Sequence, residues 1–168
     1  AYFDLENLIP FKERKKPYPK IEYIPSDKDY NWRTYVGFVP SSTLLKRLLY
    51  KSIANAHLRS ECNQDCYWSI YTYNDPSQLI NIWSQIKPWE LSEPLVTFNC
   101  NKNCDPKQIS NNPFCHSMMF IESKALFAVL TGITHWNNYE DGSVFQVRRH
   151  PDIFVEEMQS YLNFLSVL

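Results

Sequence analysis

The chain has 168 residues, is 44% hydrophobic and 15% aromatic, and carries a formal net charge of −1. This length suits one domain with a sizeable core, and the balanced charge excludes the overall attraction that binders of nucleic acid or anionic membranes usually show. The longest apolar runs, such as ALFAVL and NFLSVL, are far shorter than the roughly 20 residues that cross a bilayer, so no membrane span is expected.

Glycine is too scarce for several common nucleotide sites. The three glycines, Gly37, Gly132 and Gly142, do not cluster. A phosphate-binding loop needs several glycines close together, because the backbone must approach the phosphate without a Cβ in the way. P-loop hydrolysis, protein-kinase chemistry and Rossmann-type hydride transfer are therefore not expected.

The N-terminal segment differs in composition from the rest of the chain. It is rich in proline and carries the basic run KERKKPYPK, which favours an extended arm over a helix or a central strand. We therefore predict an arm over residues 1–31 and a single globular domain over residues 32–168. No secretory signal is recognised in AYFDLENL, and an intracellular location is expected.

The first half of the domain predicts alternating strands and helices. Aromatic and β-branched residues in TYVGFV and CYWSIYTY indicate strands over residues 34–39 and 66–73. Between these strands, leucines recur at helical spacing after Ser41 or Ser42, and either serine could cap the helix. A second helix is expected over NDPSQLINIWSQI, because Pro88 would end it.

The second half predicts further strands, helices and a hairpin. EPLVTFNC and FCHSMMFI are typical of strands, with a polar loop over residues 99–113 between them, and ESKALFAVLT is typical of a helix closed by Gly132. Two β-prone runs around Asp141 and Gly142 indicate a hairpin. From Pro151 on, the sequence predicts an amphipathic helix, whose apolar stripe would be Ile153, Phe154, Met158, Tyr161, Leu162 and Leu165.

These elements predict the fold class. Strands and helices alternate along most of the chain, while the expected hairpin requires antiparallel pairing. We therefore predict an α+β fold in which a single domain holds one mixed sheet, flanked by about four helices that include the C-terminal amphipathic helix.

The five cysteines raise three hypotheses. A zinc site needs four ligands, and the candidates are two pairs with three intervening residues and one supplement: Cys62 with Cys66, Cys100 with Cys104, and Cys115 with His116. A disulfide framework could instead hold the polar loop, and the odd count would leave one thiol over. Reduced thiols that pack as small apolar residues, without any cofactor, are the hypothesis that we favour.

Three residues occur in the chain order that is typical of one class of nucleophilic active site. Cys66, His135 and Asn137 keep the order of nucleophile, base and orienting group found in papain-like cysteine hydrolases. This resemblance implies a cysteine hydrolase as one alternative function. The acidic pairs lie in polar surroundings, and neither HExxH nor GxSxG is present in the sequence, so no other catalytic set is expected.

The aromatic runs suggest a second alternative. TYVGFV and CYWSIYTYNDPSQL resemble the two aromatic strand motifs of an RNA-recognition motif. The resemblance covers at most residues 33–99 and implies a domain that binds single-stranded RNA or DNA. Rings would then stack on bases and cations would lie near phosphates, the candidates being Tyr35, Trp68 and Tyr71 for stacking and Arg33 and Lys46 for phosphate.

We favour a non-catalytic domain that binds another macromolecule, above all a protein. No catalytic set stands out in the sequence, whereas 5 Trp and 11 Tyr supply the amphipathic aromatic surface that interfaces use. A subunit of a larger assembly and an inhibitor or immunity protein would both fit this description.

Overall fold

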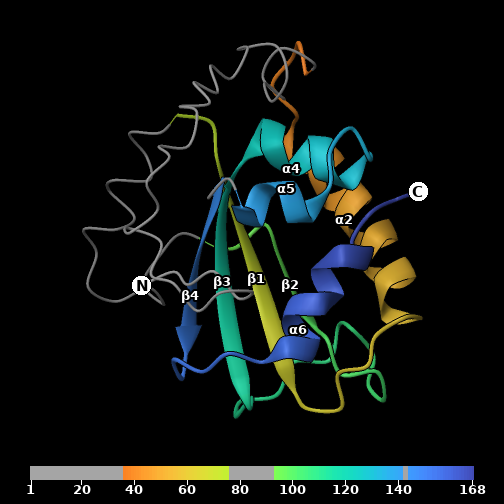
Figure 1. Cartoon of the computed structure of the whole chain (residues 1–168), viewed down its shortest axis with the longest axis vertical. Coiled ribbons are helices and arrows are strands. Elements are labelled where there is room, and N and C mark those ends of the chain that lie inside the picture. The colour runs from red at the N-terminus through yellow and green to blue at the C-terminus, as the bar shows by residue number, and fades with distance from the viewer. Residues whose placement is uncertain (1–35, 76–92, 142–143) are drawn as a thin grey trace, which may run out of the picture. The chain divides into compact units, whose positions relative to one another are not determined.

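The computed structural model describes residues 36–75, 93–141 and 144–168 (Figure 1). Within them, four strands form one mixed sheet in the order β2-β1-β3-β4. Their bounds are Cys66–Tyr73 for β1, Val96–Asn99 for β2, Cys115–Glu122 for β3 and Phe145–His150 for β4. The central strands β1 and β3 run parallel, while β2 pairs with β1 and β4 pairs with β3 in antiparallel fashion.

Helices cover one face of this sheet (Figure 1). They are α2 (Ser42–His57), α4 (Ser123–Leu130), α5 (Trp136–Asp141), α6 (Glu156–Ser160) and the 3-10 helix η3 (Tyr161–Phe164). The predicted α+β single-domain fold with a mixed sheet is confirmed. None of the described helices is both long enough and apolar enough to span a membrane.

The face of the sheet under the helices is the hydrophobic core. Trp68 on β1 is 1% exposed, and its indole N–H donates to the Met158 carbonyl at 3.1 Å. The Tyr161 ring packs 5.6 Å from that of Phe98, and its hydroxyl donates to the Ile53 carbonyl at 3.1 Å. Each large ring therefore buries its apolar body while its polar end finds a partner.

Several elements agree with the sequence. Ser41 caps α2, because its hydroxyl oxygen accepts the Leu44 amide at 3.2 Å. The strands predicted around CYWSIYTY, EPLVTFNC and FCHSMMFI are present, and residues 100–114 form a loop without helix or strand. Gly132, with φ of 75°, follows α4 in the left-handed conformation that closes a helix.

The predicted strand over residues 34–39 is wrong for the part that the structure describes. Residues 36–39 form neither helix nor strand. Val36 is buried, and the Phe38 ring packs edge-on against Phe127 of α4 at 5.2 Å. A β-prone composition reflects side-chain packing more than an intrinsic backbone preference. The apolar side chains of this segment can therefore be buried against a helix without forming a strand.

The predicted hairpin around Asp141 and Gly142 is also wrong. Residues 136–141 form α5, and β4 pairs with β3, not with the preceding segment. Trp136 is buried and donates its indole N–H to the Leu165 carbonyl at 2.9 Å, so tertiary contacts select the helix. The expected antiparallel pairing does occur, but with a strand distant in the sequence.

The C-terminal helix is shorter than predicted. It begins at Glu156, not at Pro151, and continues as η3. Of the predicted apolar stripe, Ile153 and Phe154 are exposed, and the remaining members, Met158, Tyr161, Leu162 and Leu165, are buried. The predicted arm over residues 1–31 and most of the helix predicted from Asp75 lie outside the described residues.

Candidate functional site

Four of the five cysteines converge at the end of the sheet where β1 and β3 begin. Cys66 and Cys115 are neighbours across the two strands. The Cys100 amide donates to the Cys66 carbonyl at 2.8 Å, and the Lys102 amide donates to the Cys62 carbonyl at 2.8 Å. All four cysteines are buried, and all five thiols of the chain are free. The four buried thiols therefore form a compact cysteine cluster.

The predicted zinc set of Cys62, Cys66, Cys100 and Cys104 is not brought together. The Cys104 thiol lies outside the cluster and donates to the Asp65 carboxylate at 3.8 Å. In the parts of the chain that the structure describes, no three His, Cys, Asp or Glu side chains are arranged to hold a metal. The predicted supplements also separate, because Cys115 faces the core while His116 faces the other side of the sheet.

The predicted hydrolase residues lie at different ends of the sheet. Cys66 begins β1, whereas α5 lies towards the opposite end (Figure 1). Trp136, next to His135, packs its ring 5.9 Å from that of Phe145, which pairs with Ile121 near the end of β3. About six residues of strand separate this level from Cys66, or roughly 20 Å, which is far beyond hydrogen-bond reach. Cys66 and His135 therefore form no catalytic pair in this structure.

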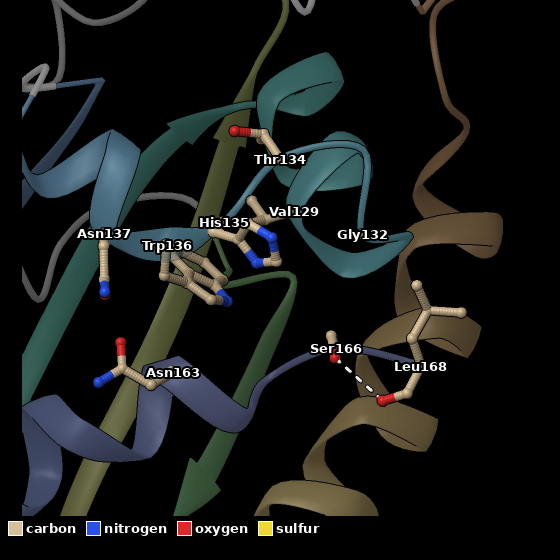
Figure 2. A pocket seen from close by; sticks show the side chains of 9 residues that line it. All are labelled: Val129, Gly132, Thr134, His135, Trp136, Asn137, Asn163, Ser166 and Leu168. Carbon is tan, nitrogen blue, oxygen red and sulfur yellow. Dashed lines mark hydrogen bonds between the residues drawn. The ribbon is translucent and has the colours of Figure 1, made fainter.

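His135 and Asn137 instead line a small pocket between α4, α5, η3 and the C-terminal segment (Figure 2). Its volume is about 200 Å³, below the roughly 300–1,000 Å³ of typical small-molecule sites. No cysteine lines it, and the indole N–H of Trp136 is already bonded to Leu165. Asn163 points into the same space from η3 (Figure 2). This pocket lacks the nucleophile that the hydrolase hypothesis requires.

The residues expected to contact nucleic acid are also dispersed. Trp68 is buried under the helices, and Tyr71 lies on the other face of β1, where its ring stacks on Phe120 at 5.0 Å. Burial raises the pKa of Tyr71. Lys46 is exposed on α2, and Tyr35 and Arg33 lie outside the described residues. Because Trp68 and Tyr71 point in opposite directions, they cannot form a shared stacking platform.

The face of the sheet away from the helices carries a polar network. Ser69 Oγ lies 2.7 Å from His116 Nε2 and 2.7 Å from Thr97 Oγ1. Burial, and to a smaller extent the charge of His150, lowers the pKa of His116. Ser69 is only 1% exposed and already has two partners. A serine and histidine in contact resemble a catalytic pair, but Ser69 is buried and its hydroxyl is shared with Thr97, as in a structural network.

Asp65 organises the long loop over residues 100–114. Its carboxylate accepts hydrogen bonds from the side-chain amides of Asn99 at 3.3 Å and Asn101 at 3.1 Å. These bonds, with Asn101 contributing most, lower the pKa of Asp65. The Tyr67 hydroxyl also accepts the Ser110 amide at 2.7 Å. The loop is therefore anchored to the sheet by hydrogen bonds from several points along its length.

Near the cysteine cluster, apolar side chains are exposed in what we call the end patch, which comprises Phe114, Ile153, Phe154 and Arg149. Phe114, Ile153 and Phe154 are 47%, 36% and 65% exposed. The two contributing segments meet where the Cys115 thiol lies 4.0 Å from the Ile153 carbonyl. The Arg149 guanidinium carbon lies 5.5 Å from the Phe154 ring centroid. The sequence did not reveal this surface, because helical spacing assigned Ile153 and Phe154 to a buried stripe.

No protein-family model, curated protein or solved structure matches this chain. Functional assignment therefore depends on the geometry of the end patch, the cysteine cluster and the polar network.

Proposed function

We propose that this domain is non-catalytic and binds another protein through the end patch. The observation that carries the proposal is the exposure of Phe114, Ile153 and Phe154 beside Arg149 at one end of the sheet. Aromatic residues and arginine are the types most enriched at the energetic centres of protein interfaces. An arginine over an aromatic ring also presents a planar donor next to an apolar surface.

Hydrogen bonds hold the backbone beneath the end patch in place, which favours binding. Arg149 belongs to β4, which is hydrogen-bonded to β3 through residues including Ser117. The Ile153 amide donates to the Pro151 carbonyl at 2.8 Å, and this bond constrains the turn that presents Phe154. A surface already held in place loses less conformational entropy when it binds. We therefore expect a partner with an apolar surface and a carboxylate that reaches Arg149.

The test compares two exposed phenylalanines, each beneath an arginine. Phe154 lies in the end patch, and Phe164 lies elsewhere with the Arg59 guanidinium carbon 5.6 Å from its ring centroid. The wild-type chain, Phe154→Ser and Phe164→Ser are immobilised, and the proteins retained by each are quantified by mass spectrometry. We expect Phe154→Ser to weaken retention of a specific partner about tenfold or more, as for an interface hot spot, while Phe164→Ser retains it.

Two outcomes contradict the proposal. One is equal retention of every partner by the two variants, because the end patch would then contribute nothing. The other is salt-sensitive binding of a labelled single-stranded RNA that Phe154→Ser leaves intact, which would favour a nucleic-acid surface instead. Circular dichroism of both variants provides the control for folding.

A further inference from the structure

Cys62 and Cys66 lie close together in the segment that leads from α2 into β1. Residues 58–65 form neither helix nor strand, and the Cys66 amide donates to the Gln64 carbonyl at 2.8 Å. The Cys62 thiol also donates to the Gln64 carbonyl at 3.4 Å. Backbone hydrogen bonds from Lys102 and Cys100, each 2.8 Å long, hold the carbonyls of Cys62 and Cys66. The Gln64 carbonyl thus joins the Cys62 side chain to the Cys66 backbone, at the point where the irregular segment enters β1.

The two thiols differ in their electrostatic surroundings. The hydrogen bond with Cys66, helped by the Gln64 backbone, lowers the pKa of Cys62 to about 7, against burial and the carboxylates of Glu157 and Asp65. The same hydrogen bond, followed by burial, raises the pKa of Cys66. Because the thiolate is the reactive form of cysteine, Cys62 is the member of the pair suited to attack an oxidant. Cys66 remains protonated beside it.

Cys62 is buried, but the residues that flank it in the chain are exposed. Its neighbours Glu61, Asn63 and Gln64 are exposed, so its sulfur lies directly beneath a surface loop. Cys100 and Cys115 lie in the same packed core as Cys62 and Cys66, but burial is the main cause that raises the pKa of both thiols. A small oxidant is therefore expected to react with Cys62 before either of them, because the thiolate is the reactive form.

We propose that Cys62 and Cys66 form a peroxide-sensitive modification site that closes to a disulfide. In the first step the Cys62 thiolate attacks one oxygen of hydrogen peroxide, the O–O bond breaks, and the leaving oxygen departs as water after protonation. In the second step the Cys66 sulfur attacks the Cys62 sulfur, the S–O bond breaks, and the Cys66 proton leaves with that oxygen as a second water. Two thiols are oxidised by two electrons, and one peroxide is reduced to two waters.

The experiment treats the reduced full-length chain with hydrogen peroxide, alkylates the remaining thiols and maps the peptides by mass spectrometry. We expect a loss of two hydrogens in the peptide that contains both Cys62 and Cys66, reversible by dithiothreitol. Cys62→Ser should abolish this loss, whereas Cys104→Ser should retain it, because Cys104 lies outside the cysteine cluster. Cys66→Ser should accumulate a sulfenic acid at Cys62 that dimedone traps.

Three results would overturn the proposal. They are a disulfide between another pair such as Cys66 and Cys115, a persistent loss of two hydrogens in Cys62→Ser, and a stoichiometric zinc ion that protects the cysteine cluster from oxidation. If Cys62→Ser does not fold, the wild-type chain still decides the question through iodoacetamide labelling near neutral pH. Fastest labelling at Cys62 supports the proposal, and fastest labelling at Cys104 contradicts it.

Discussion

The two faces of the sheet are built from the same strands but are held together by different forces. Trp68 points towards the helices into an apolar core, and the next residue, Ser69, points away into hydrogen bonds with His116 and Thr97. Dispersion and burial on the first face tolerate small shifts, whereas hydrogen bonds on the second require defined distances and partners. The contribution of the first face to stability should therefore depend on side-chain volume. The contribution of the second face should depend on whether each hydrogen-bonding group keeps its partner.

The largest expected effect tests the helical face. Trp68→Ala should lower the free energy of unfolding by about 3–5 kcal/mol, because it leaves a cavity and removes the hydrogen bond to the Met158 carbonyl. Urea denaturation followed by fluorescence of the remaining tryptophans measures this change. Trp68→Phe keeps most of the ring volume and should cost less. A loss below about 1 kcal/mol for the alanine variant would show that Trp68 is not a core residue.

A smaller effect is expected on the polar face. Ser69→Ala should cost about 1–3 kcal/mol, because Thr97 Oγ1 and His116 Nε2 each lose their contact with Ser69 Oγ. Equilibrium unfolding in urea gives the value. The double variant with Thr97→Val should cost less than the sum of the two single variants, since the hydroxyls are partners. If the two single effects on the free energy of unfolding simply add in the double variant, Ser69 and Thr97 are not coupled.

The smallest effect concerns the pH dependence of the polar face. The pKa of His116 lies below its ordinary 6.5, mainly because of burial, with His150 as its charged neighbour. The unfolded chain therefore binds more protons in this range, and the free energy of unfolding should fall as the pH drops from 6.5 towards the lower folded-state value. Unfolding midpoints measured at a series of pH values give the slope of the free energy of unfolding against pH, which tests this expectation.

The control for this pH dependence is the exposed His135. His135→Gln should leave the slope unchanged, whereas His116→Gln should reduce it. An identical slope for His116→Gln and the wild-type chain would assign the pH dependence to other groups, and the polar face would then lose its distinguishing property.

Local patterns were sufficient for several elements. The strand predicted over residues 66–73 has the same bounds as β1. Side chains that alternate between the two faces of a strand form a local pattern that can be recognised in the sequence. Ser41 followed by leucines at helical spacing placed the start of α2 equally well. In both cases the residues that determine the element lie within a few positions of one another.

Functional residues were much less predictable. The zinc hypothesis paired Cys104 with Cys100 by their spacing, but the loop turns Cys104 towards Asp65. The register of β1 and β3 brings Cys115 beside Cys66 instead. The contact between Ser69 and His116 likewise joins residues far apart in the sequence. No local pattern encodes these contacts, because they depend on which strands pair and in what register.

The sequence by itself determined the α+β class, the main helix and the strands whose periodicity is local. Only the tertiary structure decided that β4 pairs with β3, that residues 136–141 form a helix, and that Phe154 is exposed. The physical reason is that a β-prone or amphipathic segment can satisfy its apolar side chains in several ways. The choice among them depends on surfaces supplied by distant parts of the chain, here the carbonyl of Leu165 for Trp136 and the edge of β3 for β4.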